Sequence, residues 1–276
     1  YGSTTHPILE DVTPDSTTIL VGEDVIASGE FQAGDLIKIK DAEYIGDPSY
    51  VKGEFLTVGS LTSSGINVTR KPENKYIASE SGCILKVYPT KNVSVQGITF
   101  AGPGVETQPS AIVFVAAENI KISECAFSHW GVQAIQFGDV LRATVANNTF
   151  DTIYTTGLGY GINIGNCSRD IKILKNSFVG RGRHYIATGA GASDYTAGGW
   201  PGHIVISENY FESAVQEAIN THMNWNAYGS IVVTNNVFSG CDQAVEVSNA
   251  NLIFDGNFVV NANYGVRCFS VGHSNK

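Results

Sequence analysis

Apolar and polar residues alternate in a series of short segments, a period of two that is typical of β-strands. Each segment ends in a large apolar residue, usually Phe, and successive copies begin 21 to 33 residues apart. The copies are VSVQGITF (93–100), IKISECAF (120–127), ATVANNTF (143–150), IKILKNSF (171–178), IVISENYF (204–211), IVVTNNVF (231–238) and LIFDGNFV (252–259). None has the i, i+3, i+4 spacing of a helix, so the pattern predicts one strand per copy.

A second short apolar segment follows each copy. These segments are AIVFV (111–115), AIQFG (134–138), GINIG (161–165), YIATG (185–189), AINTH (218–222), AVEVS (244–248) and GVRCF (265–269). The second residue of each is Ile or Val, and we expect these residues to stack in one buried column: Ile112, Ile135, Ile162, Ile186, Ile219, Val245 and Val266. Two alignable strands in every period predict a solenoid of parallel coils.

A third column contains asparagine in the last five copies. It lies two residues before the terminal apolar residue of five copies: Asn148, Asn176, Asn209, Asn236 and Asn257. Stacked Asn side chains can hydrogen-bond from one coil to the next, as ladders do in stacked parallel strands. Asn also tolerates the left-handed backbone that tight bends require. We therefore interpret this column as a structural ladder at a bend.

The N-x-F ladder and the Ile/Val strands resemble the pectate-lyase-like superfamily of right-handed parallel β-helices. Its members include polysaccharide lyases, glycoside hydrolases, epimerases and the tailspikes of bacterial viruses. The resemblance covers about two-thirds of the chain. It implies an all-β fold in which residues 91–276 form a parallel β-helix of about seven coils. These motifs are specific for the fold, and no short catalytic signature identifies one activity.

Residues 1–90 lack the period. They contain strand and turn signals, namely STTILV (16–21), GDLIKIK (34–40), GEFLTVGSL (53–61), GINVTR (65–70) and CILKVYP (83–89). We expect a small β-rich domain that caps the open first coil, because a solenoid end exposes apolar interior and unpaired edges. The sequence GVRCFSVGHSNK ends in mid-coil. We expect the protein to continue there or to pair with other copies, for example as a homotrimer.

Charge and cysteine content exclude several functions. Lys and Arg number only 17 and the net charge is −9, whereas nucleic-acid binding requires clustered positive charge. The chain contains no run of 18 apolar residues, so we expect no membrane span. The sequence opens at Tyr1 without a signal-peptide pattern, which says little about export. Its five cysteines lack CxxC spacing, which favours small buried side chains over a metal site or disulfide framework. The sequence contains no dense cluster of acidic residues of the kind that binds Ca²⁺. We expect no cofactor.

The second strand changes character halfway along the series. Its outward positions become polar or titratable at Asn163, Asn220, His222 and Glu246, which predicts a substrate-binding surface there. Two long insertions, 188–203 and 221–229, flank these positions. Loops on a rigid scaffold commonly carry function, and aromatic rings suit sugar faces. The aromatic residues of these loops that we assign to a glycan groove are Tyr195, Trp200 and Trp225.

The hexapeptide GRGRHY (180–185) fits a lyase. Arg181 and Arg183 could neutralise the carboxylate of an acidic sugar through a bidentate fork. A β-elimination also needs a base beside that carboxylate, for which His184, Tyr160 and His222 are candidates. The alternative is that the two arginines pair with nearby acids such as Asp151 or Asp194.

A hydrolase needs two carboxyl groups instead, about 5–5.5 Å apart in retaining enzymes and about 6.5–9.5 Å apart in inverting ones. Glu217 and Asp242 lie on adjacent coils, with Cα atoms expected to be roughly 6 Å apart. Stacking of Glu246 on Arg267 predicts a surface ion pair. His184 and Glu217 share one bend column, between Tyr160 and Gln243, and could form a base and its orienting group. The alternative is a buried hydrogen bond that closes the bend.

These features lead to two hypotheses. The first is an enzyme, a lyase or glycoside hydrolase, that cleaves an extracellular or cell-surface polysaccharide, for example as a viral tailspike. Its catalytic candidates are His184, Glu217, Arg183, Tyr160 and Asp242. The second is a glycan-binding adhesin or structural fibre module without activity, since a fold does not imply a function. Both place the protein outside the cell, at a cell surface or on a virion.

Overall fold

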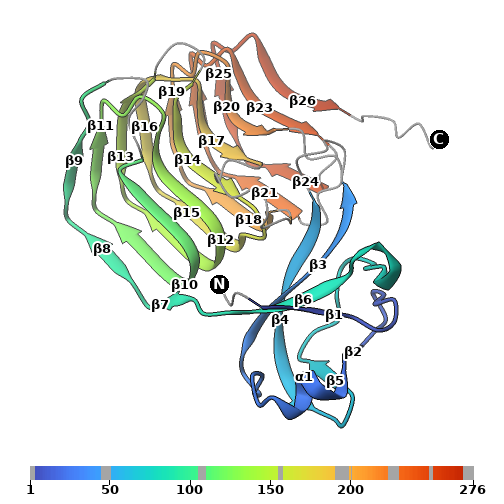
Figure 1. Ribbon diagram of the computed structural model, residues 1–276. Coiled ribbons are helices and arrows are strands. Elements are labelled where there is room, and N and C mark those ends of the chain that lie inside the picture. The colour runs from blue at the N-terminus through green and yellow to red at the C-terminus, as the bar shows by residue number, and fades with distance from the viewer. Residues whose placement is uncertain are drawn as a thin grey trace. The chain divides into compact units, whose positions relative to one another are not determined.

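The computed structural model describes residues 4–44, 51–104, 110–154, 158–189, 199, 201–222, 230–248 and 251–269. They belong to two compact units, one ending at Thr90 and one beginning at Lys91 (Figure 1). No helix among these residues is long and apolar enough to cross a membrane.

The first unit is built on a 6-stranded antiparallel sheet in the order β1-β6-β3-β4-β5-β2. The strands are β1 (Thr5–Pro7), β2 (Thr18–Leu20), β3 (Leu36–Tyr44), β4 (Val51–Leu61), β5 (Gly65–Val68) and β6 (Cys83–Val87), joined by the short helices α1 (Glu23–Ala27) and η1 (Ala78–Glu80). Each strand from β2 onward overlaps a predicted strand segment, although β3 runs four residues past its segment and β4 begins two residues before its own. Alternating residues such as Ile37, Ile39 and Leu56 form the unit's own apolar core.

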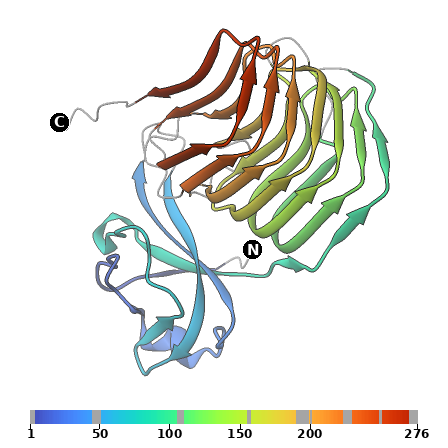
Figure 2. The same ribbon diagram turned by 180° about the vertical axis from the view of Figure 1, so that it is seen from behind.

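The second unit is a right-handed parallel β-helix with three strands in a full coil (Figures 1 and 2). The first face consists of β8 (Ser94–Gln96), the second halves of β10 (Ile112–Ser123) and β12 (Gln133–Ala146), β15 (Arg169–Leu174), β18 (Gly202–Ser207), β21 (Ser230–Thr234) and β24 (Asn251–Asp255). The second face is a 7-stranded sheet of β9 (Thr99–Ala101), β11 (Ala126–Ser128), β13 (Thr149–Ile153), β16 (Ser177–Gly182), β19 (Tyr210–Glu212), β22 (Val237–Ser239) and β25 (Phe258–Val260).

The third face follows in each coil and carries the candidate site. It consists of the first halves of β10 and β12, then β14 (Tyr160–Gly165), β17 (His184–Thr188), β20 (Glu217–Thr221), β23 (Gln243–Ser248) and β26 (Tyr264–Phe269). The short strand β7 (Thr90–Lys91) pairs with β10 at the start of this unit.

The prediction of two strands per coil was wrong, because the Asn bend divides each predicted first strand in two. IKILKNSF, for example, splits into the end of β15 and the start of β16. The left-handed residue is also not the ladder asparagine but the residue before it. Lys175 has φ 56° and Glu208 has φ 58°, so residues without a special preference for this region adopt it. The hydrogen bonds of the adjacent asparagine explain why the bend is retained.

The Asn ladder is confirmed. Each Nδ2 donates to the Oδ1 of the next coil, from Asn148 to Asn176 (2.9 Å), onward to Asn209 (3.0 Å), to Asn236 (3.0 Å) and to Asn257 (2.9 Å). The same Oδ1 atoms accept backbone N–H groups of the preceding coil. The ladder thus satisfies buried backbone groups that the bend removes from the strand pairing.

The apolar interior follows the predicted register. The Ile/Val column pairs residue by residue from Ile112 to Val266, and its central members are fully buried. The prediction that the whole column is buried fails at both ends, since Ile112 is only partly buried and Val266 is 40% exposed on the last described coil. Beside this column, Phe127, Phe150, Phe178, Phe211 and Phe238 form a stack with ring centroids 4.6–4.9 Å apart.

Candidate functional site

The polar cluster of the third face lies where β14, β17, β20 and β23 run side by side (Figures 1 and 2). Their first residues stack as predicted, with Tyr160 beside His184 and Glu217 beside Gln243. Because a parallel β-helix repeats this register in every coil, residues far apart in sequence come within side-chain contact here.

The centre of the cluster is a hydrogen-bonded imidazole–carboxylate pair. Nδ1 of His184 lies 3.0 Å from Oε2 of Glu217 and 3.1 Å from the backbone oxygen of the same residue. The His184 side chain is only 1% exposed, and that of Glu217 is 15% exposed. A hydrogen bond from Nδ1–H fixes the tautomer and the ring orientation. Among the described atoms, the buried Nε2 of His184 has no hydrogen-bond partner.

Glu217 is held in its ionised form. Burial by itself raises the pKa of this carboxyl group, but the hydrogen bonds from His184 and from Nδ2 of Asn220 (3.0 Å) outweigh burial and lower the pKa to about 2. The contact with Asn220 also settles which way the bend residues point. Asn220 is an outward residue that alternates with the buried Ile219, so Glu217 and His184 lie on the outside of the coil and not in its core.

Glu246 is the second carboxyl group of the cluster. Its strand position lies beside Asn220, and its Oε2 is 3.7 Å from Nη1 of Arg267, so the predicted ion pair is present. Burial and the negative charge of Glu217 nevertheless raise the pKa of Glu246, and Arg267 offsets only part of this effect. The cluster therefore contains two neighbouring carboxyl groups whose pKa values are shifted in opposite directions. The sequence predicted only the surface ion pair of Glu246 with Arg267 and not this difference between Glu246 and Glu217.

His222 completes the cluster from the end of β20. Its ring meets those of His184 and Tyr160 edge to face, with centroids 4.6 Å and 5.8 Å away. Burial, followed by the nearby positive charges of His184 and Arg183, lowers the pKa of His222 to about 3. The imidazole is thus neutral at physiological pH. Its buried Nε2, like that of His184, has no partner among the described atoms.

Acid should destabilise the fold through His222. Between pH 6.5 and about 3, His222 is protonated in the unfolded chain and neutral in the folded protein. As the pH falls through this window, the free energy of unfolding therefore decreases by about 1.4 kcal/mol per pH unit because of this group. Urea unfolding of His222→Gln at several pH values in the window should therefore show a shallower acid loss than the parent protein. Parallel pH curves for the two proteins would contradict this assignment.

The two arginines of GRGRHY each lie against a tyrosine. Nη1 of Arg183 donates to the hydroxyl of Tyr160 (2.9 Å), and its Nε donates to Oε1 of Gln216 (2.8 Å). The guanidinium of Arg181 lies 4.0 Å from the ring centre of Tyr154, a cation–π contact. Arg183 thus belongs to the cluster, whereas Arg181 is placed beside it on β16.

Other predicted site residues lie elsewhere. Asp242 is exposed and its Oδ1 accepts a hydrogen bond from Asn263 (2.6 Å). Its role as the carboxyl partner of Glu217 stays a prediction, whereas Glu246 and Glu217 interact electrostatically. Asn163 is buried on the outer side of β14 and donates to Oε1 of Gln133 (3.0 Å). The aromatic loop residues Tyr195, Trp200 and Trp225 lie outside the described residues.

Two residues of the site were not predicted. Gln216 orients Arg183, and Tyr154 supports Arg181. Gln216 directly precedes β20 and Tyr154 directly follows β13. The sequence repeat does not extend to these positions of the coil, so it did not indicate either residue. Within the described part of the chain, no group of three or more His, Cys, Asp or Glu side chains is positioned to hold a metal ion.

The fold has counterparts among solved structures. The tailspike gp61 of Pseudomonas phage phi297 matches with a TM-score of 0.66 over 99% of this chain, at 13% sequence identity. The chain has the parallel β-helix fold of phage tailspikes. The tailspike gp49 of Pseudomonas phage LKA1 (TM-score 0.58, 15% identity, 95% of this chain) and the Gp54 tailspike of Acinetobacter baumannii bacteriophage AP22 (0.57, 17%, 94%) also match.

The likeness to these tailspikes concerns architecture. This chain spans about half of their length, between 45% and 48%. The Gp54 structure contains a capsular saccharide of A. baumannii. No protein-family model and no curated protein sequence matches the chain.

Proposed function

We propose that this protein cleaves a surface polysaccharide by acid–base hydrolysis at Glu217 and Glu246. The observation that carries this proposal is the opposite displacement of their pKa values, lowered for Glu217 and raised for Glu246. Two titratable groups whose environments separate their pKa values are the arrangement that acid–base catalysis requires. The parallel β-helix fold shared with a tailspike that holds a capsular saccharide supports a glycan as the substrate.

In this mechanism Glu246 is the acid and Glu217 the base. Protonated Glu246 donates its proton to the glycosidic oxygen as the bond from that oxygen to the anomeric carbon breaks. Ionised Glu217 stabilises the positive charge that develops on the sugar and takes a proton from the water that adds to the anomeric carbon. His184 and Asn220 act as positioning residues, because their hydrogen bonds hold the Glu217 carboxylate in one orientation.

A lyase is the second candidate, because Arg183 contacts the Tyr160 hydroxyl. Arg183 would neutralise the carboxylate of a uronic acid, and Tyr160 would remove the neighbouring proton. Elimination leaves a carbon–carbon double bond in the product, whereas hydrolysis leaves none. The ultraviolet absorption of the product therefore distinguishes the two reactions.

The direct test uses a panel of bacterial capsular polysaccharides and O-antigens. Hydrolysis is expected to shorten one of them, to raise the number of reducing ends and to leave the ultraviolet absorption unchanged. Shortening with new ultraviolet absorption would replace the proposal by the lyase. Binding without shortening would identify a glycan-binding adhesin, and neither binding nor shortening across the panel would overturn a role on glycans.

The pH dependence of cleavage should show an alkaline limb set by Glu246. The acid works only while protonated, so the rate falls as the pH rises through the raised pKa of Glu246, whereas Glu217 stays ionised down to about pH 2. Arg267 lowers the pKa of Glu246, so Arg267→Gln should move the alkaline limb of kcat/KM to higher pH. Lys175→Gln, at an exposed bend of the same β-helix, is the control and should leave the limb in place. A limb that moves to lower pH in Arg267→Gln would contradict the assignment.

A further inference from the structure

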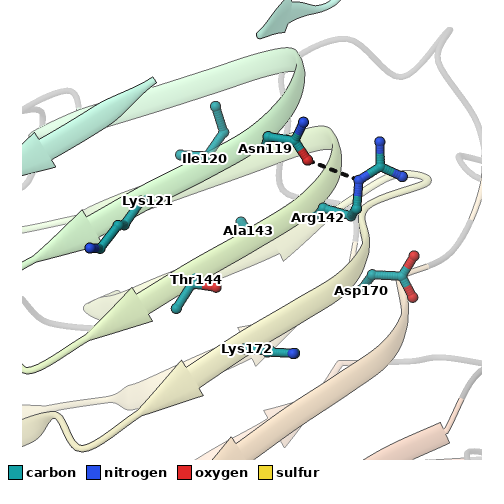
Figure 3. A pocket seen from close by; sticks show the side chains of 8 residues that line it. All are labelled: Asn119, Ile120, Lys121, Arg142, Ala143, Thr144, Asp170 and Lys172. Atoms are coloured by element: carbon teal, nitrogen blue, oxygen red, sulfur yellow. Dashed lines mark hydrogen bonds between the residues drawn. The ribbon is translucent and has the colours of Figure 1, made fainter. Parts of the chain in front are cut away.

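The first face of the β-helix contains an open hollow away from the cluster described above. Its volume is about 450 Å³. It is lined by Asn119, Ile120, Lys121, Arg142, Ala143, Thr144, Asp170 and Lys172. Figure 3 shows Lys121, Thr144 and Lys172 on successive strands, with Asn119, Arg142 and Asp170 at the bend that precedes these strands.

Positive charge is concentrated in this hollow, although the whole chain has a net charge of −9. Lys121 and Lys172 are exposed, and the structure gives neither ammonium group an acidic partner among the described residues. Arg142 is held in place, because its Nε donates to Oδ1 of Asn119 (2.9 Å) and its guanidinium pairs with Glu118. The two lysines are therefore the cations available to a ligand.

Strand register fixes the spacing of these cations. Lys121 pairs with Thr144, and Thr144 pairs with Lys172. The lysines are thus two strand spacings apart, roughly 10 Å for strands separated by about 4.8 Å. The hydroxyl group of Thr144 lies between them, while Asn119 and Asp170 lie at the bends of the two coils that carry the lysines. This arrangement suits a ligand whose negative charges are separated by neutral, hydroxyl-rich units.

We propose that this hollow is a second glycan-binding site, which takes an acidic polysaccharide lying along the helix axis. Lys121 and Lys172 bind carboxylates on separate sugars, while Thr144 faces the hydroxyl groups between them, and Asn119 and Asp170 face hydroxyl groups at the bend. Nucleic acid fits less well, because Asp170 would meet a continuous row of phosphates and none of the lining residues is aromatic, whereas base stacking on aromatic rings is usual in single-strand binding. The site lies on the first face and Glu217 on the third, so it would hold the polymer without cleaving it.

The test measures binding to the full chain by calorimetry, with short oligomers of galacturonic acid and of hyaluronan as acidic probes and maltohexaose as the neutral probe. The measurement uses the Glu217→Gln background, in which the proposed hydrolysis is expected to be lost, and gel filtration of the probe after the titration checks that its length is unchanged. At least one acidic probe should bind, and the neutral probe should bind much more weakly. The double variant Lys121→Gln/Lys172→Gln should weaken binding of the acidic probe about tenfold, since exposed charge contacts are individually modest.

The matched control is Lys71→Gln/Lys75→Gln, which removes the same charge from exposed lysines of the first unit. It should change the affinity less than twofold. If both double variants weakened binding of the acidic probe equally, the binding would depend on the overall charge of the protein, and the proposed site would be overturned. No binding of either acidic probe, or tighter binding of charge-matched single-stranded DNA, would also overturn the proposal. None of these readouts depends on cleavage, so the proposed hydrolysis and this site can fail separately.

Discussion

Replacing Glu217 with Gln is expected to lower kcat/KM for polysaccharide cleavage by about a thousandfold, the scale of a lost general base. The substitution keeps the shape of the side chain and its carbonyl oxygen still accepts hydrogen bonds from His184 and Asn220. It removes the negative charge that stabilises the transition state and takes the proton. The measurement is steady-state kinetics on the polysaccharide found by the panel, together with thermal unfolding of both proteins.

Glu208→Gln is the control for this substitution. Glu208 lies at a bend of the same β-helix, and among the described residues its carboxylate pairs with the exposed Lys175 in a 3.5 Å contact. Its replacement should leave kcat/KM within about twofold of the parent, because exposed ion pairs contribute little. If Glu217→Gln retained full activity with normal unfolding, the chemistry would lie outside this cluster. A large fall in melting temperature for Glu217→Gln would instead assign the pair with His184 to stability.

Replacing Phe178 with Ala should cost about 3–5 kcal/mol of unfolding free energy. Phe178 is fully buried and lies between Phe150 and Phe211, with ring centroids 4.6 Å and 4.9 Å away. The coils on both sides are fixed by the Asn ladder and by strand pairing, so the cavity cannot collapse. Equilibrium unfolding in urea measures the loss.

Phe258→Ala provides the matched comparison on the same face of the β-helix. Phe258 is 62% exposed on β25 and belongs to the outward column. The same substitution there removes little buried surface and should cost less than about 1 kcal/mol. Equal losses for the two variants would mean that the Phe stack does not carry the stability that its burial implies.

Much of the site could be predicted from sequence because the register of a solenoid is nearly one-dimensional. Once the Ile/Val column is aligned, residues at equal offsets must be neighbours in space. That argument brought His184 to Glu217 and Glu246 to Arg267, and both pairs are present. The same argument places Asp242 on the coil next to Glu217, and that pairing stays a prediction, because at a bend the alternation of side-chain directions is interrupted.

The sequence by itself determined the parallel β-helix, the Asn ladder and the stacking of the Ile/Val column. These features depend on a period of two within strands and on repetition between coils, and both periods are visible in the residues. Only the tertiary structure decided that each coil has three strands. The left-handed bend residue is Gly or Asn in some coils, but Lys175 and Glu208 adopt this backbone without any local preference for it. It also decided that Glu217 and Glu246 differ in pKa, because desolvation and partner charges arise from side chains of several coils and not from local sequence.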